Sequence, residues 1–286
     1  MKSKKSIGYI IVALLAVTLV GFGIHSFTAN SASKDSDIVV GSQGSDYDIW
    51  QHIAKSPQAK KLGLHISVKQ INDGVQLNKA TTDGTVDVNA FQSWSYLQAY
   101  NKENKAGQLK ALGTTYLEPL GIYSNKYKNV KDIPNGTTVA IVNNPANTSR
   151  DLLLLQSAGL LKLKPGFNAL GDTRDIASNP RHLKFDEIDD TTGPRVLKSV
   201  PVVLISNKVA LEGNLNVLKD SIFHEQVNDS TKDNINVLAT AKKNANNDKY
   251  KKLINLYHEP AIQKYIKAKY DGTKVEVKKP LSYLNK

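Results

Sequence analysis

Residues 137–161 contain the feature that most restricts the fold of this chain. A largely β-branched run, Thr137–Val142, is followed by a polar loop with Pro145 and then by a leucine-rich segment that closes at Gly159. This order predicts a strand, a loop and a helix, which is the repeating unit of α/β proteins.

The start of this predicted helix is a candidate anion site. Thr148 is a favourable N-cap residue, and Asp151 completes an acidic variant of the capping box. The helix is therefore expected to begin at Ser149 or Arg150. Free backbone N–H groups and the fork of donors on Arg150 then favour a carboxylate or phosphate. The segment lacks the pattern of a nucleotide-binding loop, which favours a small carboxylate. The competing interpretation is that Arg150 is an ordinary surface arginine.

Strand and helix patterns alternate along the rest of the chain. Strands are expected at 38–41, 64–70, 85–91, 117–124, 201–208 and 235–240, and helices at 47–61, 75–81, 248–257 and 260–269. Asp46 is the expected cap of the first of these helices. The alternation predicts an α/β fold with largely parallel sheets that carry helices on their faces.

Three aromatic residues, Phe91, Trp94 and Tyr96, follow one another at the end of the third expected strand. Ligands of open α/β sheets bind at the carboxyl ends of the strands, so these rings are candidate pocket walls. Burial in the core is an equally common fate for aromatic rings.

Length and charge limit the possible partners. A chain of 286 residues is long enough for two compact units. Its net charge of +12 is spread along the sequence without a run of five basic residues. Nucleic acid is therefore not an expected partner, whereas an anionic membrane or cell wall is compatible with a basic surface.

The N-terminal residues predict export. Lys2, Lys4 and Lys5 precede an apolar run from Ile7 to Ile24, and small polar residues follow. We interpret residues 1–33 as a signal peptide or an N-terminal membrane anchor with its linker, with cleavage near Ala32 and retention both open. The rest of the chain is expected outside the cytoplasm. The sequence contains no cysteine, so it has no disulfide and no cysteine that could carry a lipid.

The sequence contains no pattern typical of catalysis or of a cofactor. His224-Glu225 and His258-Glu259 lack the second histidine of a zinc-protease helix, and both pairs are expected at the surface. The acidic run 186–190 could bind a cation but is more typical of a solvated patch. No nucleophile elbow occurs. We therefore expect a protein that is not an enzyme and holds no cofactor or metal.

Several motifs together resemble one family. They are Val39–Gly41, Asp87–Gln92 with Tyr96-Leu97, Leu117–Ser124, Asn143–Asn147 with Arg150, Leu183–Phe185 and Pro194-Arg195. In these motifs the chain resembles the NlpA family of methionine-binding lipoproteins, the substrate-binding components of ABC transporters. The resemblance implies a two-lobed fold like that of type II periplasmic binding proteins, each lobe a mainly parallel sheet flanked by helices. It places residues 36–125 and 235–286 in the first lobe and residues 126–234 in the second.

The resemblance also implies roles for individual residues. Arg150 matches the arginine that binds the ligand carboxylate, Phe91 matches a ring that packs on the ligand, and Asn236 matches an asparagine that hydrogen-bonds it. The remaining expected pocket residues are Ser93, Trp94, Tyr96, Tyr116, Asn147 and Ser206.

Some pocket positions differ from the family pattern. Gly74 and Ala90 stand where tyrosines are usual, Ser93 and Tyr116 stand where histidines are usual, and Ser206 replaces an asparagine. Loss of two rings and a histidine is expected to enlarge the cavity, although Trp94 and Tyr116 could refill part of it. The ligand could therefore be methionine, another amino acid, a short peptide or another carboxylate.

The leading hypothesis is an extracytoplasmic binding protein of an ABC importer. It would bind a small carboxylate ligand between two lobes and deliver it to a permease with its ATPase, and its N-terminal segment would contact the membrane. The alternative is a surface-tethered interaction protein that kept the scaffold and lost the pocket.

Overall fold

The structure is a computed structural model that describes residues 38–168 and 171–285, and Asp37–Lys286 form one unit. The expected signal or anchor segment, 1–33, lies outside the described residues. Within the described ranges, no helix has the length and apolar character needed to cross a membrane.

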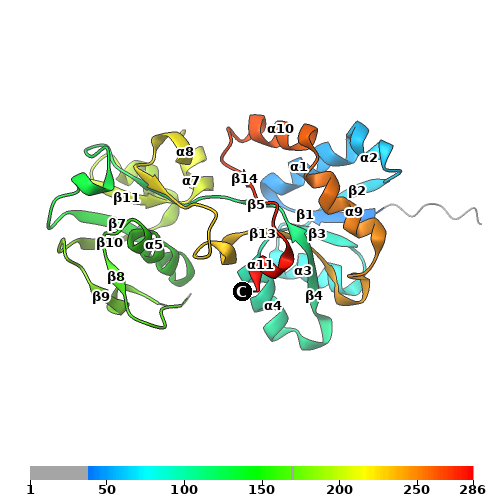
Figure 1. The fold of residues 1–286 in the computed structure, drawn as a ribbon, viewed down its shortest axis with the longest axis horizontal. Coiled ribbons are helices and arrows are strands. Elements are labelled where there is room, and N and C mark those ends of the chain that lie inside the picture. Colours follow the sequence, from blue (N-terminus) through cyan, green and yellow to red (C-terminus); the bar gives the residue numbers. More distant parts are fainter. Residues whose placement is uncertain (1–37, 169–170, 286) are drawn as a thin grey trace, which may run out of the picture. The chain divides into compact units, whose positions relative to one another are not determined.

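The first sheet has the strand order β2-β1-β3-β13-β4 (Figure 1). Four of these strands run in one direction, and β13 is antiparallel to both of its neighbours. The strands are β1 (Ile38–Ser42), β2 (Ile66–Gln70), β3 (Val88–Ser93), β4 (Leu109–Thr114) and β13 (Asn236–Ala241).

The second sheet repeats this arrangement with the order β10-β7-β11-β6-β12. Here β6 is the one antiparallel strand. The strands are β6 (Gly121–Tyr123), β7 (Thr138–Val142), β10 (Lys184–Ile188), β11 (Val202–Ile205) and β12 (Phe223–His224). The expected α/β fold with mainly parallel sheets is confirmed.

Helices cover both faces of each sheet because their apolar sides are buried against the strands. Apolar side chains of α1, α9 and α10 (blue and orange in Figure 1) pack on one face of the first sheet, and those of α4 and α11 pack in a second cluster with β4 and β13. In the second sheet, α5 shares one cluster with the strands and α6, α7 and α8 share another. The helices are α1 (Gly44–Lys55), α2 (Pro57–Lys61), α3 (Gly74–Asp83), α4 (Trp94–Glu103), α5 (Pro145–Ser157), α6 (Gly193–Val196), α7 (Asn207–Glu212), α8 (Val217–Asp220), α9 (Asp248–Tyr257), α10 (Pro260–Lys269) and α11 (Leu281–Leu284).

Two segments connect the sheets. Residues 115–120 lead from β4 to β6 and contain β5 (Tyr116–Leu117), which pairs with β14 (Val275–Glu276). Residues 225–235 lead from β12 back to β13. We call these segments the first and second crossover. The second sheet also carries a separate two-stranded ribbon of β8 (Lys162–Leu163) and β9 (Ile176–Ser178).

Several expected boundaries are wrong. The single helix expected at 47–61 is divided at Ser56, whose backbone is extended. Asp46 lies inside the first turn of α1 and is not its cap. The strand expected at 117–124 is divided into β5 and β6. Residues 121–123, placed with the first lobe by the sequence analysis, pair with strands of the second sheet.

Candidate functional site

One edge of the first sheet brings three of the expected site residues into a row. Ser93 ends β3 and pairs with Asn236 at the start of β13. The backbone N–H of Thr115 donates to the carbonyl of Asn236 over 2.9 Å, so Tyr116 follows directly. Residues from distant parts of the chain therefore lie side by side at the carboxyl end of β3, where open α/β sheets bind ligands.

The expected aromatic wall is present beside this row. The rings of Phe91 and Tyr96 meet edge to face with centroids 5.8 Å apart, and Tyr96 is 40% exposed. A Cβ atom at Gly74 would lie 2.8 Å from the Phe91 ring and 3.0 Å from the Tyr96 hydroxyl, so these two rings occupy the space next to the glycine. Trp94 is half-buried and packs against the core cluster of α4, β13 and α11.

Helix α5 starts earlier than the sequence analysis expected. Asn144 is its N-cap and accepts a hydrogen bond from the Asn147 backbone N–H over 3.1 Å, while Pro145 occupies the first turn. Thr148 donates its hydroxyl to the Val142 carbonyl instead of capping the helix. Arg150 therefore lies in the second turn, and the prediction that it adds to first-turn N–H groups is wrong.

Asp151, the other half of the expected capping box, accepts from the Val142 N–H over 2.8 Å. It is buried, and this burial raises its pKa to about 8 against the opposing effects of the Val142 hydrogen bond and Arg150. Its role is thus to bind the end of β7.

The Arg150 guanidinium is paired within the protein. Its Nε donates to Glu225 Oε1 over 2.9 Å and its Nη2 to Glu225 Oε2 over 2.5 Å, and Nη2 also donates to the Glu118 carbonyl over 2.9 Å. The side chains of Arg150 and Glu225 are 26% and 5% exposed. Burial alone would lower the pKa of Arg150, but the paired carboxylate reverses the effect and the pKa is raised.

This geometry corrects two expectations. The guanidinium fork is not fully open, because Glu225 occupies its Nε–Nη2 edge. Nη2 also donates to the Glu118 carbonyl, and Nη1 makes no hydrogen bond with the described residues. Glu225 is not a surface residue: it also accepts from the Leu120 N–H over 3.0 Å. His258 is not at the surface either, since it is buried between the Thr114 carbonyl and Glu276.

Tyr116 belongs to a buried charge cluster that the sequence analysis missed. Its hydroxyl donates to Asp46 Oδ2 over 2.7 Å, and its ring lies 3.8 Å from Lys274 Nζ. The side chain of Lys274 is 1% exposed, and its Nζ pairs with Glu118 Oε1 at 2.9 Å. Burial raises the pKa of Asp46 to about 6, although Lys274 and Tyr116 lower it. Burial, followed by Asp46, also raises the pKa of Tyr116.

Ser206 and Asn147 lie at the corresponding edge of the second sheet. Ser206 follows β11 and donates to the Asp190 carboxylate, with distances of 3.3 and 3.2 Å to its two oxygens. The half-buried side chain of Asn147 makes no hydrogen bond with the described residues. Asp190 was part of the acidic run in the sequence, and only its position at this edge distinguishes it.

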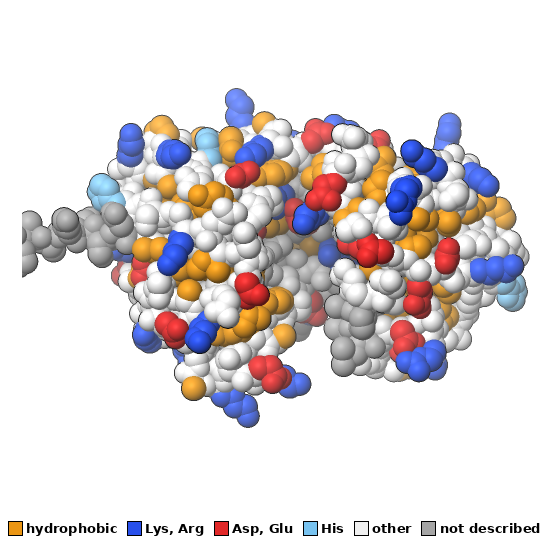
Figure 2. Space-filling model, turned by 180° about the vertical axis from the view of Figure 1, so that it is seen from behind, with side chains coloured by type: hydrophobic (Ala, Val, Ile, Leu, Met, Phe, Trp, Pro, Cys, Tyr) orange, Lys and Arg blue, Asp and Glu red, His pale blue; other side chains and the backbone are white. Residues whose placement is uncertain are grey.

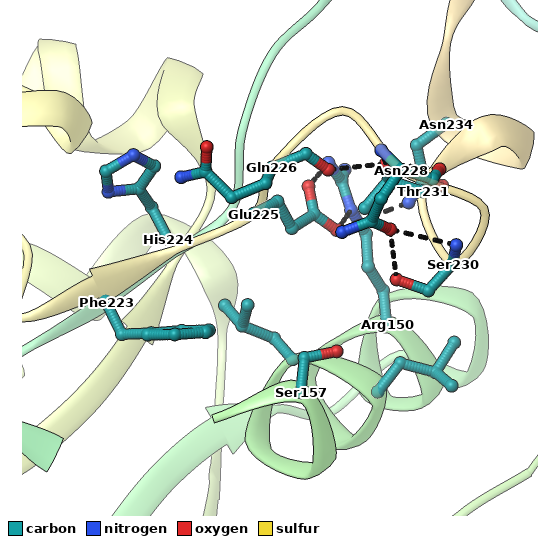
Figure 3. A pocket seen from close by; sticks show the side chains of 12 residues that line it. Arg150, Ser157, Phe223, His224, Glu225, Gln226, Asn228, Ser230, Thr231 and Asn234 are labelled. Atoms are coloured by element: carbon teal, nitrogen blue, oxygen red, sulfur yellow. Dashed lines mark hydrogen bonds and ion pairs between the residues drawn. The ribbon is translucent and has the colours of Figure 1, made fainter. Parts of the chain in front are cut away.

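A pocket of about 120 Å³ lies between α5 and the second crossover (Figure 3). Arg150 rises from α5 beside Glu225, and Phe223, Ser157 and Asn234 are among the other lining residues. Arg150 is the only expected ligand-binding residue that lines it. Among the described residues, no group of three His, Asp or Glu side chains is placed to hold a metal ion.

Comparison with known proteins identifies the relatives of this chain. A family model described as NlpA lipoprotein matches residues 38–278. The chain belongs to the NlpA lipoprotein family.

Among its NlpA relatives, the methionine-binding lipoprotein MetQ of Bacillus subtilis is 36% identical over 77% of this chain and 81% of the relative. The D-methionine-binding lipoprotein MetQ of Escherichia coli (strain K12) is 32% identical over 84% of this chain and 86% of the relative. A nutrient binding protein from Burkholderia cenocepacia, solved bound to methionine, has a TM-score of 0.66 at 37% identity and covers 84% of this chain and 99% of its own. The resemblance inferred from the sequence motifs is therefore confirmed.

Proposed function

We propose that this protein is the extracytoplasmic substrate-binding component of an ABC importer and binds methionine, a related amino acid or a short peptide. The proposal rests on family membership and on relatives whose names or titles describe methionine binding. The ligand would lie between the carboxyl edges of the two sheets and the permease with its ATPase would receive it. The N-terminal segment would keep the protein at the membrane.

The observation that carries the ligand assignment is Nη1 of Arg150, which makes no hydrogen bond with the described residues. Glu225 fixes the Nε–Nη2 edge of the guanidinium, so Nη1 is oriented before a ligand arrives. A guanidinium held in this way loses less conformational entropy on binding than a mobile one. Nη2 of Arg150 also donates to the carbonyl of Glu118, which lies in the first crossover two residues after Tyr116. The crossover thus joins Arg150 to the row of Ser93, Asn236 and Tyr116.

Arg150→Lys tests this assignment. Lysine keeps a cation beside Glu225 but lacks a second nitrogen, the equivalent of Nη1, that could donate to the ligand. We expect L-methionine, or the best of a panel of L-amino acids and dipeptides, to raise the melting temperature of the unchanged protein, and Arg150→Lys to weaken binding at least about tenfold.

The matched control is Arg174→Lys, because Arg174 pairs with Asp172 at an 88% exposed position. This control should bind like the unchanged protein. If Arg150→Lys also binds unchanged, Arg150 does not contact the ligand. If no compound of the panel binds, the proposed function is wrong.

A second function is favoured by one observation, the internal pairing of Arg150 with Glu225. A scaffold that no longer binds small ligands could keep this pair for stability alone and act as a surface-tethered interaction protein. The ligand panel separates the two functions, since only the first predicts a shift of the melting temperature.

Charged side chains give no support for a nucleic-acid partner. On the face drawn in Figure 2, basic and acidic side chains are interspersed and form no continuous basic stripe.

A further inference from the structure

Asp190 is a carboxylate of the second sheet that the proposed function leaves without a role. It follows β10, and Ser206, its hydrogen-bond partner, follows β11. The strand between these two is β7, which leads into α5 and Arg150. Asp190 and Ser206 therefore meet across the end of β7.

The sheet register places these residues at one level. Ile188 of β10 is paired with Val142 of β7, and the Asn143 N–H donates to the Ile188 carbonyl over 2.9 Å. Val203 of β11 is paired with Ala140 of β7. The three carboxyl ends thus form the edge at which an open α/β sheet binds its ligand.

Among the residues that the structure describes, none forms an ion pair with Asp190. No cation of the described residues lies within ion-pair distance of its carboxylate, which is half-buried. It nevertheless lies within electrostatic reach of Arg150, which lowers its pKa, whereas burial has the larger and opposite effect. The hydroxyl and the backbone N–H of Ser206 interact with this carboxylate, and a half-buried carboxylate with one partner residue can accept further donors.

The charges around Arg150 do not suit a simple anion. Glu225 already neutralises the guanidinium, and Asp190 adds a negative charge beside it. A ligand with only a carboxylate would approach two acidic side chains, whereas a ligand that also carries an ammonium group would compensate Asp190.

We propose that Asp190 binds the ammonium group of the ligand whose carboxylate lies on Arg150, so that the site selects amino compounds and rejects carboxylates without an amino group. Ser206 positions the Asp190 carboxylate for this contact. This inference rests on the proposed function and narrows its ligand class.

The test compares binding of an amino acid with binding of the same compound with hydrogen in place of the amino group. Isothermal titration calorimetry would use the tightest binder of the L-amino acid and dipeptide panel, for example L-methionine with 4-(methylthio)butanoate. The unchanged protein should prefer the amino compound at least about tenfold. Asp190→Asn should remove most of this preference by weakening the amino compound alone.

Asp189→Asn is the matched control, since Asp189 is exposed and its carboxylate bonds only to Thr191. It should keep the full preference. Ser206→Ala keeps the Asp190 carboxylate but removes the serine hydroxyl that bonds to it, and it should partly reduce the preference for the amino compound. This variant tests the inference even if Asp190→Asn does not fold. Equal binding of both compounds by the unchanged protein, or an undiminished preference in Asp190→Asn, overturns the inference while the proposed function stands. If no panel compound binds, the proposed function fails and this inference fails with it.

Discussion

Replacement of Glu225 by glutamine gives the most direct test of the structure around Arg150. Glu225 accepts hydrogen bonds from Arg150 Nε, Arg150 Nη2, the Leu120 N–H and the side-chain amide of Asn234, and its side chain is 5% exposed. Glutamine has nearly the same shape but only one accepting oxygen and no charge. With that oxygen kept toward Leu120, the amide NH₂ faces Arg150 Nε and the Asn234 amide. One charge-assisted hydrogen bond and one neutral hydrogen bond are then lost, and the Arg150 cation loses its counter-charge.

The size of the effect follows from these contacts. Removal of one partner of a buried ion pair costs about 3–5 kcal/mol. We expect a cost at or below the lower end of this range, because glutamine keeps some of the hydrogen bonds of Glu225. Arg150 also keeps some contact with solvent, at 26% exposure. We therefore expect Glu225→Gln to lower the free energy of unfolding by about 2–3 kcal/mol, which for a chain of this size lowers Tm by about 4–12 °C.

Denaturant titration followed by circular dichroism would measure this difference, with calorimetry for Tm. Glu187→Gln is the control, because Glu187 is exposed on β10 and its replacement should change stability by less than about 0.5 kcal/mol. If Glu225→Gln is as stable as this control, the buried pair does not form in solution and the orientation of Arg150 needs another cause.

Two further predictions concern stability. Asp151 has a pKa of about 8 when folded and 3.8 as its ordinary value, so the folded state retains a proton that the unfolded chain releases between these pH values. The free energy of unfolding should therefore fall as pH rises from 4 to 8, and this group contributes at most about 1.4 kcal/mol per pH unit to the fall. Asp151→Asn should flatten the pH profile measured by denaturant unfolding. An unchanged slope in this variant would contradict the raised pKa. Gly41→Ala would place a Cβ atom 2.5 Å from Leu77 and 2.8 Å from Val86, both of which are fully buried. We expect this change to lower the free energy of unfolding by about 1–3 kcal/mol in the same assay. An unchanged stability would show that the core rearranges to accept the methyl group.

The sequence predicted the architecture because the strand and helix patterns are local. The β-branched runs that form β1, β7 and β11 can be recognised from the residues within and next to each run. The positions of Ser93 and Ser206 at strand ends followed from the same patterns, whereas Phe91 lies inside β3. The start of α5 was misplaced although a local signal existed: Asn144 before Pro145 combines a favoured N-cap with a favoured first-turn residue, and it precedes the weaker pair of Thr148 and Asp151.

The partners of the charged residues were beyond prediction for a physical reason. Arg150 and Glu225 are 75 positions apart, and the segment around Glu225 is polar, as an exposed loop would be. Lys274 has no local feature that distinguishes it from the other lysines, yet it is buried against Glu118 and Tyr116. Burial of a charge depends on a tertiary partner, which a single sequence does not identify.

The first crossover combines the requirements of stability with those of the proposed binding site. Arg150 donates to the Glu118 carbonyl, Glu225 accepts from the Leu120 N–H, and Lys274 pairs with the Glu118 side chain. Three separate parts of the chain thus hold two residues, Glu118 and Leu120, of the segment that joins the sheets. Under the proposed function, the ligand carboxylate would bind Nη1 of the same guanidinium that contacts Glu118 and Glu225. Ligand binding would therefore change the interactions that fix the first crossover. Ligand affinity and the stability of the crossover should therefore vary together in variants of Glu225, whereas variants of Asp190 should change affinity alone.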